Sequence, residues 1–207
     1  MGAAAGEGGR GQVHDQARAM DRMYRHTRHL YDLTRRPYLL GRDAMIARMP
    51  VPAGGLVLEM ACGTGRNLVE IARRHPTAQL CGFDISAEML KTARANVARA
   101  GLSERIRLAE GDATAFDPVA AFGVSAFDVV CVSYALSMIP DWRAAIREGL
   151  RLTRPEGGFA CADFGDAAGL GAPLRRGLHG WLGLFHVTPR HDLEAELTAL
   201  PPGPAAR

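Results

Sequence analysis

The stretch Leu56–Asn67, LVLEMACGTGRN, decides the fold class of this 207-residue chain. A short apolar run ends beside an acid, Glu59, and a turn of small residues follows it. Small residues let a ligand lie against the backbone, and glycine permits positive φ. A dinucleotide fingerprint starting at Gly63 would require glycine in place of Leu68, and a P-loop would require a lysine. Because a second acid, Asp84, ends the next apolar run, the pattern favours a ligand with an ammonium group and a ribose over a pyrophosphate.

The sequence on both sides of this stretch predicts alternating strands and helices. We expect strands at Leu56–Met60, Gln79–Phe83, Ile106–Ala109, Phe127–Ser133 and Gly158–Asp163. We expect helices at Asp15–Arg36, Arg42–Met49, Arg66–Arg74, Ala87–Ala100, Trp142–Leu152 and His191–Leu200. Such alternation is typical of an α/β fold with a mostly parallel sheet, helices on both faces and right-handed crossovers. Ligands of these sheets bind beyond the carboxyl ends of the strands.

Length and composition are those of a single domain. With 207 residues, 47% of them apolar, the chain can bury one substantial core. We expect one domain over residues 15–200, with a helical lid at 15–49 and disordered tails at 1–14 and 201–207. No apolar run is long enough to span a bilayer, and the N-terminus lacks a hydrophobic signal segment, so a cytoplasmic location is the default expectation.

Cysteine and histidine spacing predicts neither disulfides nor a metal site. No pair of cysteines has the spacing of zinc ligands, so we expect reduced and buried thiols. His26 and His29 are one helical turn apart, but no third ligand is evident. The cysteines are Cys62, Cys81, Cys131 and Cys161.

Acids and small residues at the predicted strand ends are the candidates for cofactor binding. Asp84 can accept hydrogen bonds from two ribose hydroxyls, Asp112 can accept one from an adenine amino group, and Glu59 lies near the cationic end of such a ligand. Carboxylates after strands also cap helices or lie in solvent, and Glu59 could equally support the turn. The full candidate set is Glu59, Ala61, Cys62, Gly63, Gly65, Asp84, Ile85, Asp112, Ala113 and Ser133.

The segment 15–49 combines eight arginines with four aspartates and three tyrosines. It fits an amphipathic helix that covers the cofactor site, with its arginines in water. It fits equally well a surface that contacts anionic lipid headgroups, where each arginine adds about 1 kcal/mol. Nucleic acid is a weaker alternative, because the interleaved basic and aromatic strands of an RNA-binding sheet are missing.

The glycine turn and the acid after the second strand resemble motif I and its continuation in class I S-adenosylmethionine-dependent methyltransferases. Further segments are similar to bacterial betaine-lipid N-methyltransferases over about residues 20–195. These segments are DRMYRHTRHLYDLTRRPYLLGRD (Asp21–Asp43), LEMACGTGRN, GFDISAEMLKTARANVARAGL, EGDATAFDP, VSYALSMIPDW and FHVTPRHDL. The resemblance implies a Rossmann-like fold and S-adenosyl-L-methionine as cofactor. It also implies conversion of diacylglyceryl-homoserine to its N,N,N-trimethyl form.

The resemblance also assigns roles to residues. It implies that the turn Glu59–Gly65, with Asp84 and Asp112, binds the cofactor, and that the Tyr24–Tyr31 segment is a lid on the substrate side. The loop after the fourth strand faces the methyl-transfer centre in this architecture, which makes Tyr134 a catalytic candidate. Tyr24 and Tyr31, at the two ends of the lid segment, are the other catalytic candidates. The implied partners are a diacylglycerol-based lipid and an anionic membrane surface, at the inner face of the membrane. A phosphatidylethanolamine N-methyltransferase and a truncated, non-catalytic cofactor-binding protein are weaker readings of the same residues.

Two departures from the family pattern matter. Ala61 stands where the motif has its first glycine, and its methyl group either crowds the cofactor or is tolerated by the turn. The family fold ends in an antiparallel hairpin, whereas this chain ends in PPGPAAR. The strand at Gly158–Asp163 is therefore expected to be an uncovered edge, which invites self-association into a homo-oligomer. Alternatively, Ala167–Leu200 folds back over that edge, with Trp181 and Phe185 packed against it.

Overall fold

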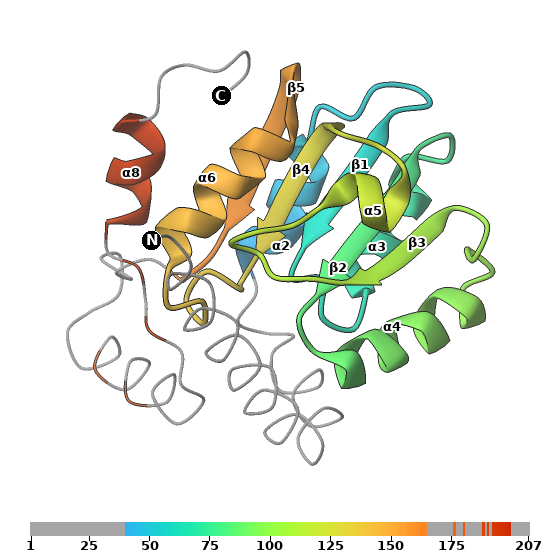
Figure 1. The fold of residues 1–207 in the computed structure, drawn as a ribbon, viewed down its shortest axis with the longest axis horizontal. Helices are drawn as coiled ribbons and strands as arrows, with labels where there is room; N and C mark the ends of the chain where they lie inside the picture. The colour runs from blue at the N-terminus through green and yellow to red at the C-terminus, as the bar shows by residue number, and fades with distance from the viewer. Residues whose placement is uncertain are drawn as a thin grey trace, which may run out of the picture.

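The computed structural model describes residues 40–164, together with residues 176, 180, 188, 190 and 192–199 (Figure 1). A five-stranded parallel sheet with the order β3-β2-β1-β4-β5 forms its centre. The strands are β1 (Leu56–Met60), β2 (Gln79–Asp84), β3 (Ile106–Glu110), β4 (Phe127–Ser133) and β5 (Thr153–Ala162). The helices are α2 (Leu40–Arg48), α3 (Arg66–Arg74), α4 (Ala87–Arg99), α5 (Pro118–Phe122), α6 (Trp142–Leu152) and α8 (Leu193–Ala199). The predicted α/β fold is confirmed, while the helix expected at 15–36 lies outside the described residues.

Two apolar cores cover the two faces of the sheet, because side chains alternate along each strand. In β1, Val57 packs into one core with α2, α3 and α4, whereas Leu58 packs into the other core with α6 and the α5 region. Both residues are fully buried. In β4, Val129 and Val130 divide in the same way. The apolar runs of the central strands therefore reflect burial on both sides, as is usual for parallel sheets.

Capping side chains fix the beginnings of three helices. The Ser86 hydroxyl accepts the N–H of Met89 at the start of α4, and the Asp141 carboxylate accepts the N–H of Ala144 at the start of α6. Serine and aspartate are typical residues at these capping positions. Helix α5 was not predicted, because five residues are too short to show a helical period. Its local signals are nevertheless clear, since Asp117 caps it, proline occupies its first position, and Gly123 ends it with φ of 72°.

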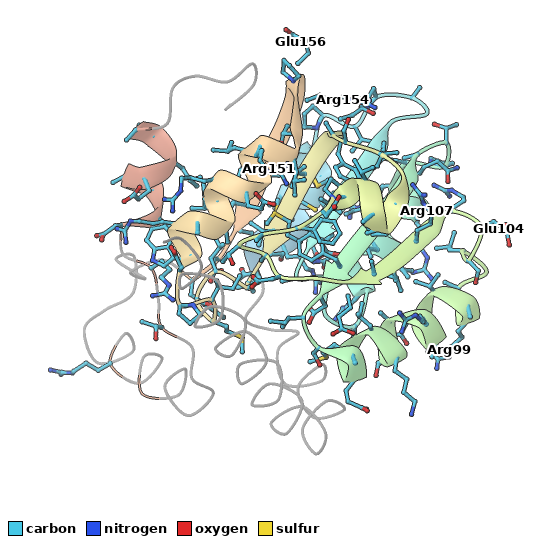
Figure 2. All side chains as sticks on the ribbon, in the orientation of Figure 1. Arg99, Glu104, Arg107, Arg151, Arg154 and Glu156 are labelled. Atoms are coloured by element: carbon cyan, nitrogen blue, oxygen red, sulfur yellow. The ribbon has the colours of Figure 1, made fainter. Side chains whose placement is uncertain are left out.

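The fifth strand begins five residues before the predicted position, directly after α6. In the added residues, Thr153 pairs with Phe127, and the register then shifts before Val129 pairs with Gly158. Arg154, which is labelled in Figure 2, also forms an ion pair with Asp128 of β4. Pro155 is tolerated here because β5 is the outer strand of the described sheet, where its missing N–H costs no ladder bond. Self-association through this edge stays a prediction that light scattering can test.

Helix α8 lies beside α6 rather than along β5 (Figure 1). Its Leu193 and Leu197 pack against the core that contains α6. Arg143 of α6 forms ion pairs with Glu196 and Asp192, at 2.5 Å and 3.4 Å. Most of the 167–200 segment, with Trp181 and Phe185, lies outside the described residues.

Candidate functional site

The carboxyl ends of β1 and β4 meet at the switch point of the strand order, where α/β sheets of this kind bind ligands. The first residue after each strand has a left-handed backbone, with φ of 49° at Ala61 and 52° at Tyr134. They are the only non-glycine residues with positive φ in the described part of the chain. Such strain costs about 1 kcal/mol or more per residue and gathers at functional sites. The backbone geometry therefore indicates that this edge of the sheet is the candidate functional site.

The turn after β1 is held open by two glycines. Gly63 has φ of 54°, and a side chain there would meet no atom within 4 Å, so the backbone faces open space. Gly65 has φ of 71°, and a Cβ would lie 3.1 Å from the Cβ of Ala93, so glycine also lets α3 approach α4. Ala61 adopts the left-handed conformation that the motif glycine would take at lower cost. The turn therefore tolerates this departure.

Asp84 ties the second strand to the glycine turn. One carboxylate oxygen accepts the N–H of Gly63 at 2.8 Å, and the other accepts the N–H of Ser86 at 2.9 Å. The side chain is only 7% exposed. Asp84 thus sets the shape of the turn. Hydrogen bonds from Asp84 to ribose hydroxyls remain a prediction. Ile85 follows it and is half-buried at the same edge.

Glu59 is a buried acid directly beneath the turn. One of its oxygens accepts from the Asn67 side chain at 2.6 Å, while the buried Oε2 atom has no hydrogen-bond partner among the residues that the structure describes. Burial, followed by repulsion from Asp84, raises the pKa of Glu59 from 4.5 to about 8, although hydrogen bonds from the Asn67 side chain and the Leu68 backbone oppose this shift. A buried acid without a full set of partners suits a cationic ligand, which would lower that pKa again.

The loop after β3 carries the third predicted acid. Asp112 accepts both the N–H and the hydroxyl of Thr114, each at 2.8 Å, which forms a local turn. Phe83 and Phe116 stack beneath this loop with ring centroids 3.9 Å apart. A Cβ on Gly111 would lie 2.5 Å from the Phe116 ring, so glycine is required at this position. The stacked rings thereby hold Asp112, and Ala113 after it, near the end of β2.

Tyr134 joins the β4 loop to the first turn of α2. Its hydroxyl accepts the N–H of Gly41 at 3.2 Å, and its ring meets Phe164 edge-on at a centroid distance of 4.8 Å. Burial raises the pKa of the Tyr134 hydroxyl. Arg42 in the same turn of α2 lies close enough to lower the pKa values of both Tyr134 and Glu59. Helix α2 therefore extends from the β4 loop toward the glycine turn.

The structure brings most of the predicted site residues to one edge of the sheet. Residues 59–65 form the end of β1 and its turn, Asp84 and Ile85 end β2, and Ser133 and Tyr134 end β4. Tyr24 and Tyr31 lie outside the described residues. The sequence did not predict two residues that contact the site. Asn67, which donates to Glu59, could have been found from its place in the first turn of α3, directly after the glycine turn. Gly41, which donates to Tyr134, has no local sequence signal. The predicted thiols are free, and Cys161 is only partly buried whereas the other three are buried.

Comparison with known proteins finds similarity to methyltransferases, whose cofactor site lies at this edge of the sheet in the resemblance described above. Residues 57–157 match a family model described as a methyltransferase domain. Over these residues the chain is similar to methyltransferase domains. A demethylmenaquinone methyltransferase of Geobacillus kaustophilus is 30% identical to it over 129 residues, which cover 62% of this chain and 53% of that protein. The chain thus spans about half the length of this curated relative. S-adenosyl-L-methionine is the cofactor that such a domain implies.

Solved structures show the same fold as the described part of this chain. The YcgJ protein of Bacillus subtilis has a TM-score of 0.60 at 21% identity, over 76% of this chain and 66% of that one. The [4+2]-cyclase SpnF has a TM-score of 0.55 at 26% identity, over 62% of this chain and 46% of its own. The orphaned Glu59 oxygen and the open backbone at Gly63 fit the ammonium group and the close approach that this cofactor needs.

Proposed function

We propose that this protein is an S-adenosylmethionine-dependent N-methyltransferase that converts diacylglyceryl-homoserine to its N,N,N-trimethyl betaine lipid. The proposal of methyl transfer rests on one observation: strained turns follow β1 and β4 at the switch point, next to the buried Glu59. The choice of a lipid amine is supported by the resemblance of segments 21–43 and 132–142 to betaine-lipid N-methyltransferases. The Tyr24–Tyr31 segment is proposed as the lid on the substrate side, at the inner face of the membrane. Within the described part of the chain, no helix is long and apolar enough to cross a bilayer.

The residues of the turn would hold the cofactor. S-adenosyl-L-methionine supplies a methyl group on a sulfonium, which is already activated for displacement. The backbone of Gly63 and Gly65 would lie against it, Asp84 would bind the ribose, and Asp112 the adenine. Glu59 would face the ammonium group, which favours its ionised form despite burial. Catalysis would then come mainly from alignment of the reacting atoms and from exclusion of water.

Tyr134 would orient the acceptor amine. The amine attacks through its lone pair, so it must reach the site without a proton on that pair. Because burial raises the pKa of Tyr134, its hydroxyl keeps its proton at neutral pH, and we assign it an orienting role rather than that of a proton acceptor. Replacement by phenylalanine should lower kcat about tenfold while leaving cofactor affinity unchanged.

A second candidate acceptor comes from the curated relatives. The matched relative from Geobacillus kaustophilus is named for demethylmenaquinone, and it is 30% identical over 129 residues. Methyl transfer to a quinone ring carbon is therefore the second proposed function. Phosphatidylethanolamine is a third candidate acceptor, because it too presents a primary amine on a diacylglycerol. Cofactor binding without catalysis is the fourth case.

One assay separates these functions. The protein is incubated with methyl-labelled S-adenosylmethionine and with vesicles that contain diacylglyceryl-homoserine, phosphatidylethanolamine or demethylmenaquinone, and the lipids are resolved by thin-layer chromatography. We expect label in the homoserine lipid. Label in demethylmenaquinone alone would support the second function, and label in phosphatidylethanolamine alone would support the third acceptor. If no acceptor is labelled although calorimetry shows S-adenosylhomocysteine binding, the protein binds the cofactor without catalysis.

A further inference from the structure

A groove of about 630 Å³ crosses α3 between α2 and α4, and it extends along α3 away from the glycine turn. Five arginines from the three helices line it. They are Arg42, Arg66, Arg73, Arg74 and Arg99. Figure 2 labels Arg99 at the end of α4. Two carboxylates also line the groove, so its formal charge is five positive against two negative.

The two carboxylates have arginine partners inside the groove. Arg42 donates twice to Asp43, at 3.0 Å and 2.9 Å, and Arg74 donates to Glu70 at 2.8 Å. The groove as a whole keeps a formal charge of three positive, since five less two is three. Arg73 is exposed, and the described residues include no ion-pair partner for it.

Helix dipoles explain only part of this arrangement. Arg73 and Arg74 occupy the last turn of α3, and Arg99 the last turn of α4, where cations are favourable. A dipole effect would be satisfied by arginines that point separately into water. It does not account for their convergence with Arg42 on one cavity, whose walls include the apolar Val69 and Ala100. Such walls limit hydration and focus the positive potential.

We propose that this groove binds a phosphate group. Guanidinium groups match phosphate oxygens in pairs and are weakly hydrated, so several of them around one concavity suit the oxygens of a phosphate monoester or diester. The phosphate belongs either to an anionic lipid headgroup or to a soluble phosphate compound. The groove begins at Arg66, directly after the glycine turn, whereas Arg73 lies seven residues further, about 10 Å along α3 toward the opposite edge of the sheet. The end of the groove at Arg73 and Arg99 is therefore separate from the residues proposed for methyl transfer. The proposal therefore stands independently of the proposed function.

Matched charge variants test the site. The groove variant Arg73→Gln/Arg99→Gln is compared with Arg94→Gln/Arg147→Gln, which removes two exposed arginines of α4 and α6 that do not line the groove. Both variants lose the same net charge. Binding is measured to inorganic phosphate by calorimetry, and to phosphatidylglycerol and phosphatidylcholine vesicles by sedimentation. S-adenosylhomocysteine binding and circular dichroism confirm the fold, and the single variant Arg73→Gln repeats the test should the double variant unfold.

We expect the groove variant to bind phosphate, phosphatidylglycerol vesicles or both about fivefold more weakly per arginine removed, and the control to bind as the wild type. Loss on phosphatidylglycerol vesicles assigns the phosphate to a lipid. Loss with inorganic phosphate alone assigns it to a soluble compound. Equal losses in the two double variants would show general charge attraction, and unchanged binding in the groove variant would show no site. Either result overturns the proposal, while normal S-adenosylhomocysteine binding would leave the methyltransferase assignment intact.

Discussion

The two edges of the sheet differ in how their polar groups are satisfied. At the amino edge, Arg105 donates to the carbonyls of Ala72, His75 and Ala78 at 2.7–3.0 Å. Asp128 there accepts the N–H of Leu56 at 2.7 Å. At the carboxyl edge, two non-glycine residues hold left-handed backbones and the buried Glu59 has an oxygen without a described partner. One edge uses its polar groups to hold the fold, whereas the other retains backbone strain and an unpartnered buried oxygen, which are features that gather at functional sites.

The largest expected effect concerns the pH dependence of Glu59. Its pKa of about 8 exceeds the unfolded value of 4.5, so between these pH values the folded protein keeps a proton that the unfolded chain releases. The free energy of unfolding should therefore fall as pH rises through that window, by up to about 1.4 kcal/mol per pH unit. Urea denaturation of the wild type and of Glu59→Gln at pH 5, 6, 7 and 8 isolates this slope. Parallel curves for the two proteins would show that the carboxyl edge is not poised in this way.

Arg105 should affect stability alone. Replacing it by alanine removes the donors to three carbonyls at the amino edge, so the free energy of unfolding should fall by about 3 kcal/mol. The affinity for S-adenosylhomocysteine should stay within twofold of the wild type. Arg94→Ala is the control, since that side chain is exposed on α4. A large loss of affinity in Arg105→Ala would remove the functional contrast between the edges.

Asp84 should affect the ligand as well as the fold. Asp84→Ala removes the acceptor that positions Gly63, and with it the proposed bonds to ribose. S-adenosylhomocysteine binding should weaken by about 1–3 kcal/mol in calorimetry. Asp128→Ala offers a matched control, because that carboxylate accepts a backbone N–H at the opposite edge. Equal affinity losses in the two variants would contradict a cofactor role specific to Asp84.

Ala61 and Gly54 give the smallest test of the same contrast. Ala61→Gly should raise the free energy of unfolding by about 1 kcal/mol, because glycine adopts φ of 49° without a Cβ clash. Gly54, in the turn at the amino edge with φ of 70°, already uses glycine, and Gly54→Ala should lower stability by a similar amount. Thermal denaturation measures both. A destabilised Ala61→Gly variant would mean that the alanine methyl contributes packing that outweighs its strain.

Local sequence signals predicted much of the architecture. The bounds of β1, β4, α3 and α6 agree with prediction, because apolar runs, glycine turns and capping residues act over a few neighbours. The early start of β5 could not be predicted, since it depends on pairing between Thr153 and Phe127 and on the ion pair of Arg154 with a residue of another strand. Helix α5 could have been found from its proline and glycine, had its capping signals been weighed above the missing period.

The sequence by itself determined the α/β class, the glycine turn and the acids that follow the strands, since each depends on residues close together in the chain. Only the tertiary structure decided that Glu59 is buried with one oxygen unpartnered among the described residues, that Tyr134 reaches Gly41, and that arginines of three helices share one groove. These features arise between segments up to 93 residues apart. Their free energy depends on burial and on distances in space, which no local pattern of residues specifies.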